Sequence, residues 1–393
     1  MLTGKRFHIF TLLGFRVNLD LSWFLIAILI SWSLATGYFP AVIEGLAPGM
    51  AWTLGIAGAL GLFASIILHE FSHAMVARQF GMPISDITLF IFGGVAELKD
   101  EPTNARAEFL VAVAGPLASY VLAGAFYLAA LALSGAAEPS PLVVLLSYLA
   151  LLNLVLATFN LLPAFPLDGG RMLRAAVWGW TGNLMRATRT AATMGRLLGG
   201  LLLALGLVSV IGGNFVGGMW QALIGFFIIS AARASESQMA ARIGFEGLTA
   251  GQLMARPAIS VPAEISLAEL VDDYFYRHFH KAYPVLRAGK VIGCVHVRDA
   301  SAYPRADWAG RTVADILPEA GRAAVIASDT PVWEALKTMN ALQVSRLAVA
   351  DDGVLAGILT MRDLMTYLSL RETFGPGHSA GPGHGRAPAP TSA

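Results

Sequence analysis

The segment ILHEFSHAMVARQF, residues 67–80, places two histidines and a glutamate within an apolar run. His69 and His73 are four residues apart, so a helix puts both side chains on one face, one turn from each other. That spacing suits two imidazoles on one tetrahedral Zn²⁺ ion, and Glu70, beside the first histidine, is placed to activate water as a general base. The segment therefore predicts a helical, zinc-dependent hydrolytic site.

A plainer interpretation of these residues is a helix in which two histidines and a glutamate are ordinary, satisfied polar side chains. In a soluble helix the two interpretations would have about equal weight. Within a membrane span, however, an ionisable side chain costs roughly 2.5–3.5 kcal/mol on insertion scales. Because this segment is apolar, we favour the metal site.

Composition divides the chain into a membrane part and a soluble part. Of 393 residues, 56% are hydrophobic and only 13% are charged, whereas soluble domains carry about 25% charged residues. Long apolar runs fill residues 21–229, and the remainder reads as soluble protein. The net charge of +1 does not favour nucleic-acid binding. The single cysteine, Cys294, excludes an intrachain disulfide, so a metal must be held by histidine and carboxylate.

Six apolar segments are long enough to cross a bilayer as helices, which takes roughly 20 residues each. They lie near residues 21–43, 51–80, 107–134, 141–162, 191–212 and 216–232. Lysine and arginine gather before the first segment, in the second and fourth connections, and after the sixth. By the positive-inside rule, this pattern predicts a multi-pass protein of the plasma membrane with both termini in the cytoplasm. The metal site would then lie about 16 Å along its helix from the cytoplasmic end, inside the bilayer.

An internal repeat of roughly 60 residues follows the membrane part. Each copy predicts a short helix, a strand, an amphipathic helix, two β-rich runs around a glycine turn, and a closing helix. This alternation indicates an α/β module. The predicted domains are a membrane domain at 1–232, a linker at 233–246, repeats at 247–302 and 311–370, and a tail at 375–393. The tail is mostly glycine, proline and alanine, cannot form a core, and is expected to be disordered.

A catalytic zinc site usually has three protein ligands and one open position. The third ligand must come from outside residues 67–80, and Asp168 in NLLPAFPLDGGR, residues 160–171, is the acidic candidate. Pro163 and Pro166 break the helix there, and non-helical backbone at membrane depth is tolerated only where it is buried or lines a wet cavity. Taken alone, however, this segment fits an ordinary helix cap in a loop at the cytoplasmic surface better than a ligand.

HEFSH in the second span and NLLPAFPLDG at the end of the fourth together resemble the site-2 proteases, a family of intramembrane zinc metalloproteases. The resemblance covers about residues 1–230. It implies a polytopic helical membrane fold and an endopeptidase that cuts membrane-embedded protein substrates.

The resemblance also implies roles for individual residues. Zinc would be held by His69, His73 and Asp168, with Glu70 activating water. Asn160 would hold the substrate or the oxyanion, and an amide N–H donor suits an oxyanion in a dry site. The alternative for Asn160 is an interhelical hydrogen bond.

Between the second and third spans, ISDITLFIFGGVAELKD contains a β-like run at residues 87–92, followed by a turn signal at Gly93 and Gly94. The run is too short to cross the bilayer. A re-entrant or interfacial strand here would hold an extended substrate by β-augmentation, which makes Gly93 and Gly94 candidate substrate-binding residues. A partly buried cytoplasmic hairpin is an equal alternative.

The repeat resembles a tandem pair of CBS domains. The family pattern Gly-x-x-Thr/Ser-x-x-Asp is present as GILTMRD in the second copy, whereas GCVHVRD in the first has His296 in place of Thr. The resemblance implies binding of ATP or another adenine nucleotide, with Asp299 and Asp363 on a ribose and Thr360 on a phosphate, and a homodimer through the pair. The alternative is a module without ligand, for dimerisation and substrate docking.

The sequence therefore predicts a six-span α-helical membrane protein with a short re-entrant or interfacial β element, followed by an α/β tandem CBS domain. The predicted function is a zinc-dependent intramembrane endopeptidase whose CBS pair regulates it or docks substrate. The rival is an ion or solute transporter or channel with regulatory CBS domains. The HExxH spacing together with Asp168 favours the protease, because an ion relay does not need that arrangement.

Overall fold

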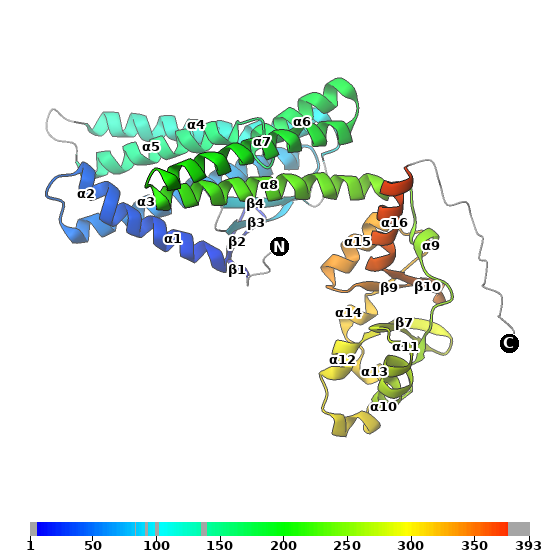
Figure 1. Cartoon of the computed structure of the whole chain (residues 1–393). Coiled ribbons are helices and arrows are strands. Elements are labelled where there is room, and N and C mark those ends of the chain that lie inside the picture. The colour runs from blue at the N-terminus through cyan, green and yellow to red at the C-terminus, as the bar shows by residue number, and fades with distance from the viewer. Residues whose placement is uncertain (1–5, 83, 91–92, 99–101, 135–139, 376–393) are drawn as a thin grey trace. The chain divides into compact units, whose positions relative to one another are not determined.

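The computed structural model describes residues 6–82, 84–90, 93–98, 102–134 and 140–375 (Figure 1). The chain divides after Met239 into two compact units. Nearly all of the predicted disordered tail, residues 376–393, lies outside the described residues, as do residues 91–92 of the predicted β-like run.

Within the described residues of the chain, six helical segments are long and apolar enough to cross a membrane. The first combines α1 (Leu21–Ser33), the π-helical η1 (Leu34–Tyr38) and α2 (Phe39–Val42). The others are α3 (Pro48–Gln79), α4 (Ala105–Leu133), α5 (Pro141–Asn160), α7 (Leu184–Ile211) and α8 (Phe215–Gly244). The predicted number of spans is confirmed.

Two boundaries differ from the prediction. α7 begins at Leu184 rather than near residue 191, because the Asn183 side chain accepts a hydrogen bond from the Arg186 backbone N–H and caps the helix. α8 continues to Gly244, so most of the segment expected to be a linker is helical.

The long helices pack lengthwise (Figure 1), with α3 in contact with α1, α4 and α5. Small residues allow close approach, as is usual between membrane helices. A Cβ added to Gly199 of α7 would lie 2.6 Å from the carbonyl oxygen of Gly225 of α8, and the reverse distance is the same. The backbones of these two helices are therefore in direct contact.

A four-stranded sheet lies against α3, in the order β1 (Arg6–Leu12), β2 (Phe15–Asp20), β3 (Ile84–Phe90) and β4 (Gly93–Leu98). β2 and β3 are parallel, and the other two pairs are antiparallel. Phe15 and Ile87 form a buried cluster with Ala74 of α3, which fixes the sheet on the helix that carries HExxH.

The sheet differs from the prediction in two ways. β1 and β2 were not expected. They form an antiparallel hairpin, and β2 pairs in parallel with β3, a strand distant in the chain whose pairing local periodicity does not reveal. The turn predicted at Gly93 and Gly94 is wrong: both are the first residues of β4 and pair with Phe90 and Leu89.

The second unit contains the predicted repeat in two structurally matching copies. The first copy comprises α9 (Ala250–Leu253), β5 (Val261–Pro262), α10 (Leu267–Glu269), η2 (Leu270–Phe275), α11 (Tyr276–His278), β6 (Ala282–Arg287), β7 (Lys290–His296) and α12 (Val297–Ser301). After η3 (Arg305–Gly310), the second comprises α13 (Val313–Ile316), α14 (Glu319–Arg322), β8 (Val325–Ile326), α15 (Val332–Ala341), β9 (Arg346–Asp351), β10 (Val354–Thr360) and α16 (Met361–Phe374).

Each copy builds a three-stranded sheet with the same pairing, one parallel and one antiparallel contact. The two hairpins turn at Ala288-Gly289 and Asp352-Gly353, where all four residues have positive φ. The copies also exchange backbone contacts, since the Ala255 N–H donates to the carbonyl oxygen of Ile358 at 2.8 Å. The predicted α/β repeat is confirmed.

Candidate metal centre

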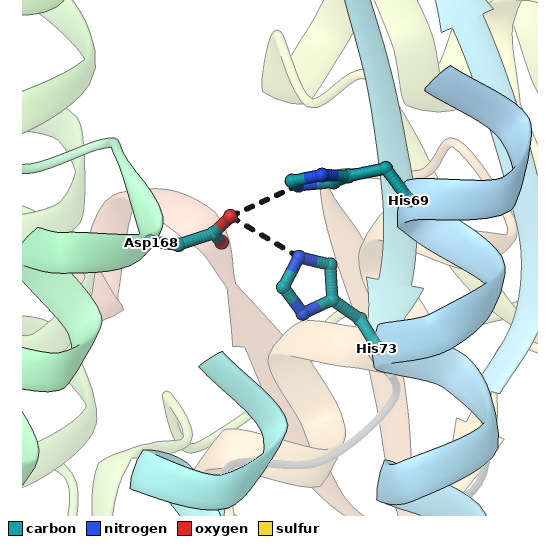
Figure 2. A group of neighbouring side chains, drawn as sticks. All are labelled: His69, His73 and Asp168. Carbon is teal, nitrogen blue, oxygen red and sulfur yellow. Dashed lines mark hydrogen bonds and ion pairs between the residues drawn. The ribbon is translucent and has the colours of Figure 1, made fainter. Parts of the chain in front are cut away.

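Three predicted metal-binding side chains meet at one point (Figure 2). His69 and His73 project from α3 toward Asp168, the first residue of α6 (Asp168–Thr181). The Asp168 Oδ2 atom lies 3.0 Å from His69 Nε2 and 3.2 Å from His73 Nε2. Both histidines are buried, at 3% and 4% exposure. Residues almost a hundred positions apart in the chain thus share one buried polar cluster.

The non-helical turn between α5 and α6 places Asp168 in this cluster. α5 ends at Asn160, and the turn that follows is tied to α7, where the Phe165 N–H donates to the carbonyl oxygen of Ala191 at 3.2 Å. The turn is tight, because a Cβ added to Gly170 would lie 2.5 Å from the Phe165 backbone nitrogen. The segment is therefore a compact turn that aims Asp168 at the histidines, which the plain-cap interpretation did not anticipate.

The second nitrogen of each imidazole is held by the neighbouring helix α4. His73 Nδ1 donates to the carbonyl oxygen of Val111 at 2.6 Å, and His69 Nδ1 lies 2.9 Å from the Ser119 hydroxyl. In a neutral imidazole that donates from Nδ1, Nε2 carries the lone pair. Such outer partners fix the tautomer and ring orientation of metal-binding histidines.

α4 passes unusually close to the two imidazoles. A Cβ added to Gly115 would lie 2.6 Å from His69 Nε2, and closer still to His73 Nε2. Only glycine is compatible with this approach. The sequence did not identify Gly115, Ser119 or Val111. The one signal is the small-residue stretch AVAGPLAS, which by itself indicates close helix packing.

The three side chains fit a zinc ion. Their donor atoms all lie within 4.8 Å of one another, and among the described residues no other cluster of this kind is present. In a tetrahedral site with Zn–N and Zn–O bonds of about 2.0–2.1 Å, two ligand atoms are about 3.3 Å apart. The observed separations of 3.0 and 3.2 Å are close to that value. Two imidazoles and one carboxylate also form a common ligand set of catalytic zinc, with a fourth position open.

Glu70 lies against the edge strand of the sheet. A Cβ added to Gly94 of β4 would lie 2.7 Å from Glu70 Cγ and 3.3 Å from its carboxyl carbon. β4 pairs with β3 on one side only, within the part of the chain that the structure describes. An unpaired strand edge and a carboxylate beside the histidines are thus neighbours.

Asn160 is the last residue of α5 and is half-buried. The described residues show no hydrogen bond from its side chain. The buried interhelical hydrogen bond of this helix is made instead by Asn153, whose Nδ2 donates to the Ser65 hydroxyl of α3 at 3.0 Å.

The predicted nucleotide-binding residues of the second unit form helix caps. Asp363 Oδ2 accepts hydrogen bonds from the Thr360 backbone N–H at 3.0 Å and its hydroxyl at 2.7 Å, at the start of α16. Asp299 accepts from the backbone N–H of His296 at 2.8 Å, at the start of α12. These residues therefore have a structural role whether or not a ligand binds.

Comparison with known proteins assigns the chain to a protein family. The model described as Peptidase family M50 matches residues 57–143 and 135–205, and the CBS domain model matches residues 250–305 and 314–370. Rip3 of Mycobacterium tuberculosis is 36% identical over 353 residues, which are 89% of this chain and 90% of Rip3. Zinc metalloprotease MJ0392 of Methanocaldococcus jannaschii is 30% identical over 311 residues, 79% of this chain and 84% of MJ0392.

Among solved structures, the site-2 protease from Methanocaldococcus jannaschii matches with a TM-score of 0.42 and 28% identity, covering 59% of this chain and 95% of that one.

The family models, the two relatives and the fold define a multi-pass membrane zinc metalloendopeptidase with a tandem CBS domain. The chain belongs to peptidase family M50, the site-2 proteases. The predicted resemblance is confirmed, and the family match favours the protease over the transporter or channel.

Proposed function

We propose that this protein cleaves membrane-embedded protein substrates with a zinc ion held by His69, His73 and Asp168. The observation that carries the proposal is the convergence of both Nε2 atoms on one Asp168 oxygen, at 3.0 and 3.2 Å. The burial of both histidines supports it, because buried polar side chains in a membrane span need partners or a metal.

Zinc, when bound, supplies Lewis-acid activation of water and of the scissile carbonyl. Glu70 accepts a proton from the attacking water and delivers it to the amide nitrogen that leaves, so the peptide bond is replaced by a carboxylate and an amine. The Asn160 side-chain amide donates a hydrogen bond to the oxyanion that develops on the carbonyl, an interaction worth about 3 kcal/mol in a dry site.

The β4 edge is the proposed substrate-binding element. A helical substrate must unwind before a peptide bond is accessible, and an unpaired strand edge holds an extended segment through main-chain hydrogen bonds. The approach of Gly94 to Glu70 supports this assignment, because it brings a bound segment next to the general base. Gly93, which precedes it on β4, belongs to the same proposed edge.

The protein is proposed to lie in the plasma membrane with both termini in the cytoplasm, as the distribution of lysine and arginine favours. His69 is then about 15 Å of helix from the cytoplasmic end of α3. Residues 1–232 would form the protease domain, and 247–302 and 311–370 the two CBS repeats.

The CBS pair is proposed to bind ATP or another adenine nucleotide and to regulate cleavage or dock substrate. Asp363 and Asp299 would contact ribose, and Thr360 a phosphate. Thr360 supports a phosphate contact because it lies at the N terminus of the long helix α16, where backbone N–H groups favour anions. A homodimer through the CBS pair is part of the same proposal.

Metal analysis of purified protein, combined with cleavage of a membrane-inserted substrate in liposomes, tests the protease mechanism. Wild type and Glu70→Gln should each hold about one zinc per chain, and only the variant should fail to cleave. Asp168→Ala should lose zinc. Absence of zinc from wild type, together with full activity of Asp168→Ala, would overturn the mechanism.

A further inference from the structure

Arg174 of α6 and Glu108 of α4 form a buried ion pair. Arg174 Nε donates to Glu108 Oε1 at 2.5 Å, and Arg174 Nη2 contacts the same oxygen. Glu108 is 0% exposed and Arg174 is 8% exposed. Taking two charges out of water is costly, and a buried pair often contributes no net stability relative to apolar residues of the same size. A gain in folding stability is therefore a weak explanation for the presence of this ion pair.

The pair connects α4, the helix that holds the two histidines, with α6, the helix that carries Asp168. Glu108 lies one turn before Val111, the residue whose carbonyl oxygen holds His73, so it belongs to the helix that orients the histidines. Arg174 lies on the same short helix as Asp168. A shift of α6 along or around its axis would move Asp168 away from the histidines, and the ion pair opposes such a shift.

Arg174 also holds the turn that leads into α6. Its guanidinium carbon lies 5.3 Å from the centre of the Phe165 ring, within the range of a cation–π contact. Phe165 is buried, at 4% exposure, and its backbone is bonded to α7. The planar guanidinium of Arg174 thus links α6 to α4 and to the turn before Asp168. Lysine has no such planar fork and is a poor replacement at a site of this kind.

We infer that Arg174, held by Glu108, is a positioning residue that sets the place of the Asp168 carboxylate relative to His69 and His73. The inference rests on the proposed zinc site. Among the contacts described above, neither Arg174 nor Glu108 touches a proposed metal ligand or the β4 edge. The inference nevertheless gives both residues a role in metal binding.

Zinc affinity, measured by competition with a chromophoric chelator, tests the inference on the full-length protein in detergent. Arg174→Gln and Glu108→Gln should each weaken zinc binding about tenfold, the lower end of the effect of removing an outer partner, because neither residue bonds to a proposed ligand directly. Arg174→Lys should fall between them and wild type. Arg189→Gln is the matched control, because Arg189 forms an exposed pair with Glu236 at 3.2 Å and should leave zinc affinity unchanged.

A second readout separates positioning from general stability. At saturating Co²⁺, Arg174→Gln should change the visible d–d absorption, since the Asp168 ligand is displaced, while the metal-free protein keeps its elution volume. Its unfolding temperature should fall, because removing one partner leaves a buried charge unpaired. Unchanged spectra and affinity in both Gln variants would overturn the inference. A loss of zinc affinity with a wild-type Co²⁺ spectrum would also overturn it, because the loss would then reflect stability alone. If Arg174→Gln does not fold, Glu108→Gln and Arg174→Lys decide by the same readouts.

Asp168→Ala distinguishes this inference from the proposed function. If Asp168→Ala loses zinc and the Arg174 and Glu108 variants keep it, only the positioning role fails. If Asp168→Ala itself binds zinc like wild type, the proposed ligand set is wrong, and the positioning role of Arg174 is wrong as well.

Discussion

The Nδ1 atom of His73 lies 2.6 Å from the carbonyl oxygen of Val111, on the neighbouring helix α4. This contact leaves the Nε2 lone pair directed at Asp168. The same helix supplies Ser119 to His69 and brings Gly115 against both rings. α4 is therefore part of the candidate metal centre although it carries none of the proposed ligands.

Ser119→Ala should weaken zinc binding about tenfold to a hundredfold, because it removes the outer partner of His69 Nδ1. Chelator competition measures the effect. Ser72→Ala is the control, since the hydroxyl of the half-buried Ser72 bonds only to the Leu68 carbonyl oxygen of its own helix among the contacts described. Equal zinc affinities in the two variants would show that Ser119 does not orient His69.

Gly115→Ala should abolish zinc binding and cleavage, because its Cβ would lie 2.6 Å from His69 Nε2. Zinc content per chain and cleavage in liposomes are the measurements. Gly124→Ala, on the same helix, is the matched control, because nothing lies within 4 Å of a Cβ added there. Normal zinc content in Gly115→Ala would mean that α4 does not approach the histidines as described.

Gly94→Ala should reduce kcat/KM about tenfold while zinc content stays normal. The added Cβ would lie 2.7 Å from Glu70 Cγ and 3.2 Å from Ile66 Cγ2, and relieving such overlap usually costs about 1–3 kcal/mol. Gly200→Ala is the control, because the space around it is open. Full activity of Gly94→Ala would argue against a close approach of β4 to the general base.

Asp363→Ala should abolish the heat of ATP binding in calorimetry. The substitution also removes a helix cap, which costs about 0.5–2 kcal/mol of stability, so a variant with the same loss is needed. Asp315→Ala provides it, since Asp315 caps α13 through Thr312 in the same way, with an O···O distance of 2.7 Å. Heat from wild type and Asp315→Ala alone supports nucleotide binding, whereas no heat from any of the three supports a module without ligand.

The Cys294 thiol should resist alkylation at pH 8 in the folded protein and react fully in denaturant. Burial raises the pKa of Cys294 from its ordinary 9.0 to about 12, so almost no thiolate is present in the folded state. The same shift makes stability fall as pH rises above 9, where the unfolded thiol ionises and the folded one does not. Rapid labelling under native conditions would contradict the burial of this residue.

The sequence by itself determined the features that depend on neighbours along the chain. Four-residue spacing puts His69 and His73 on one helix face, because a helix repeats every 3.6 residues. Apolar length identified the six spans, and self-similarity identified the two CBS repeats. The order of HEFSH and NLLPAFPLDG indicated the family, which the comparisons confirm.

Only the tertiary structure decided which distant residues meet. Taken alone, the sequence around Asp168 is typical of a helix cap. Its place beside the histidines follows from a turn that is hydrogen-bonded to α7. Gly115 looked like a packing residue, because a close approach to an imidazole depends on where α3 lies. The β2–β3 pairing joins strands that are far apart in the chain, so no local sequence pattern predicts it. Spacing within one element is a local property, whereas contacts between elements are set by how the whole chain packs.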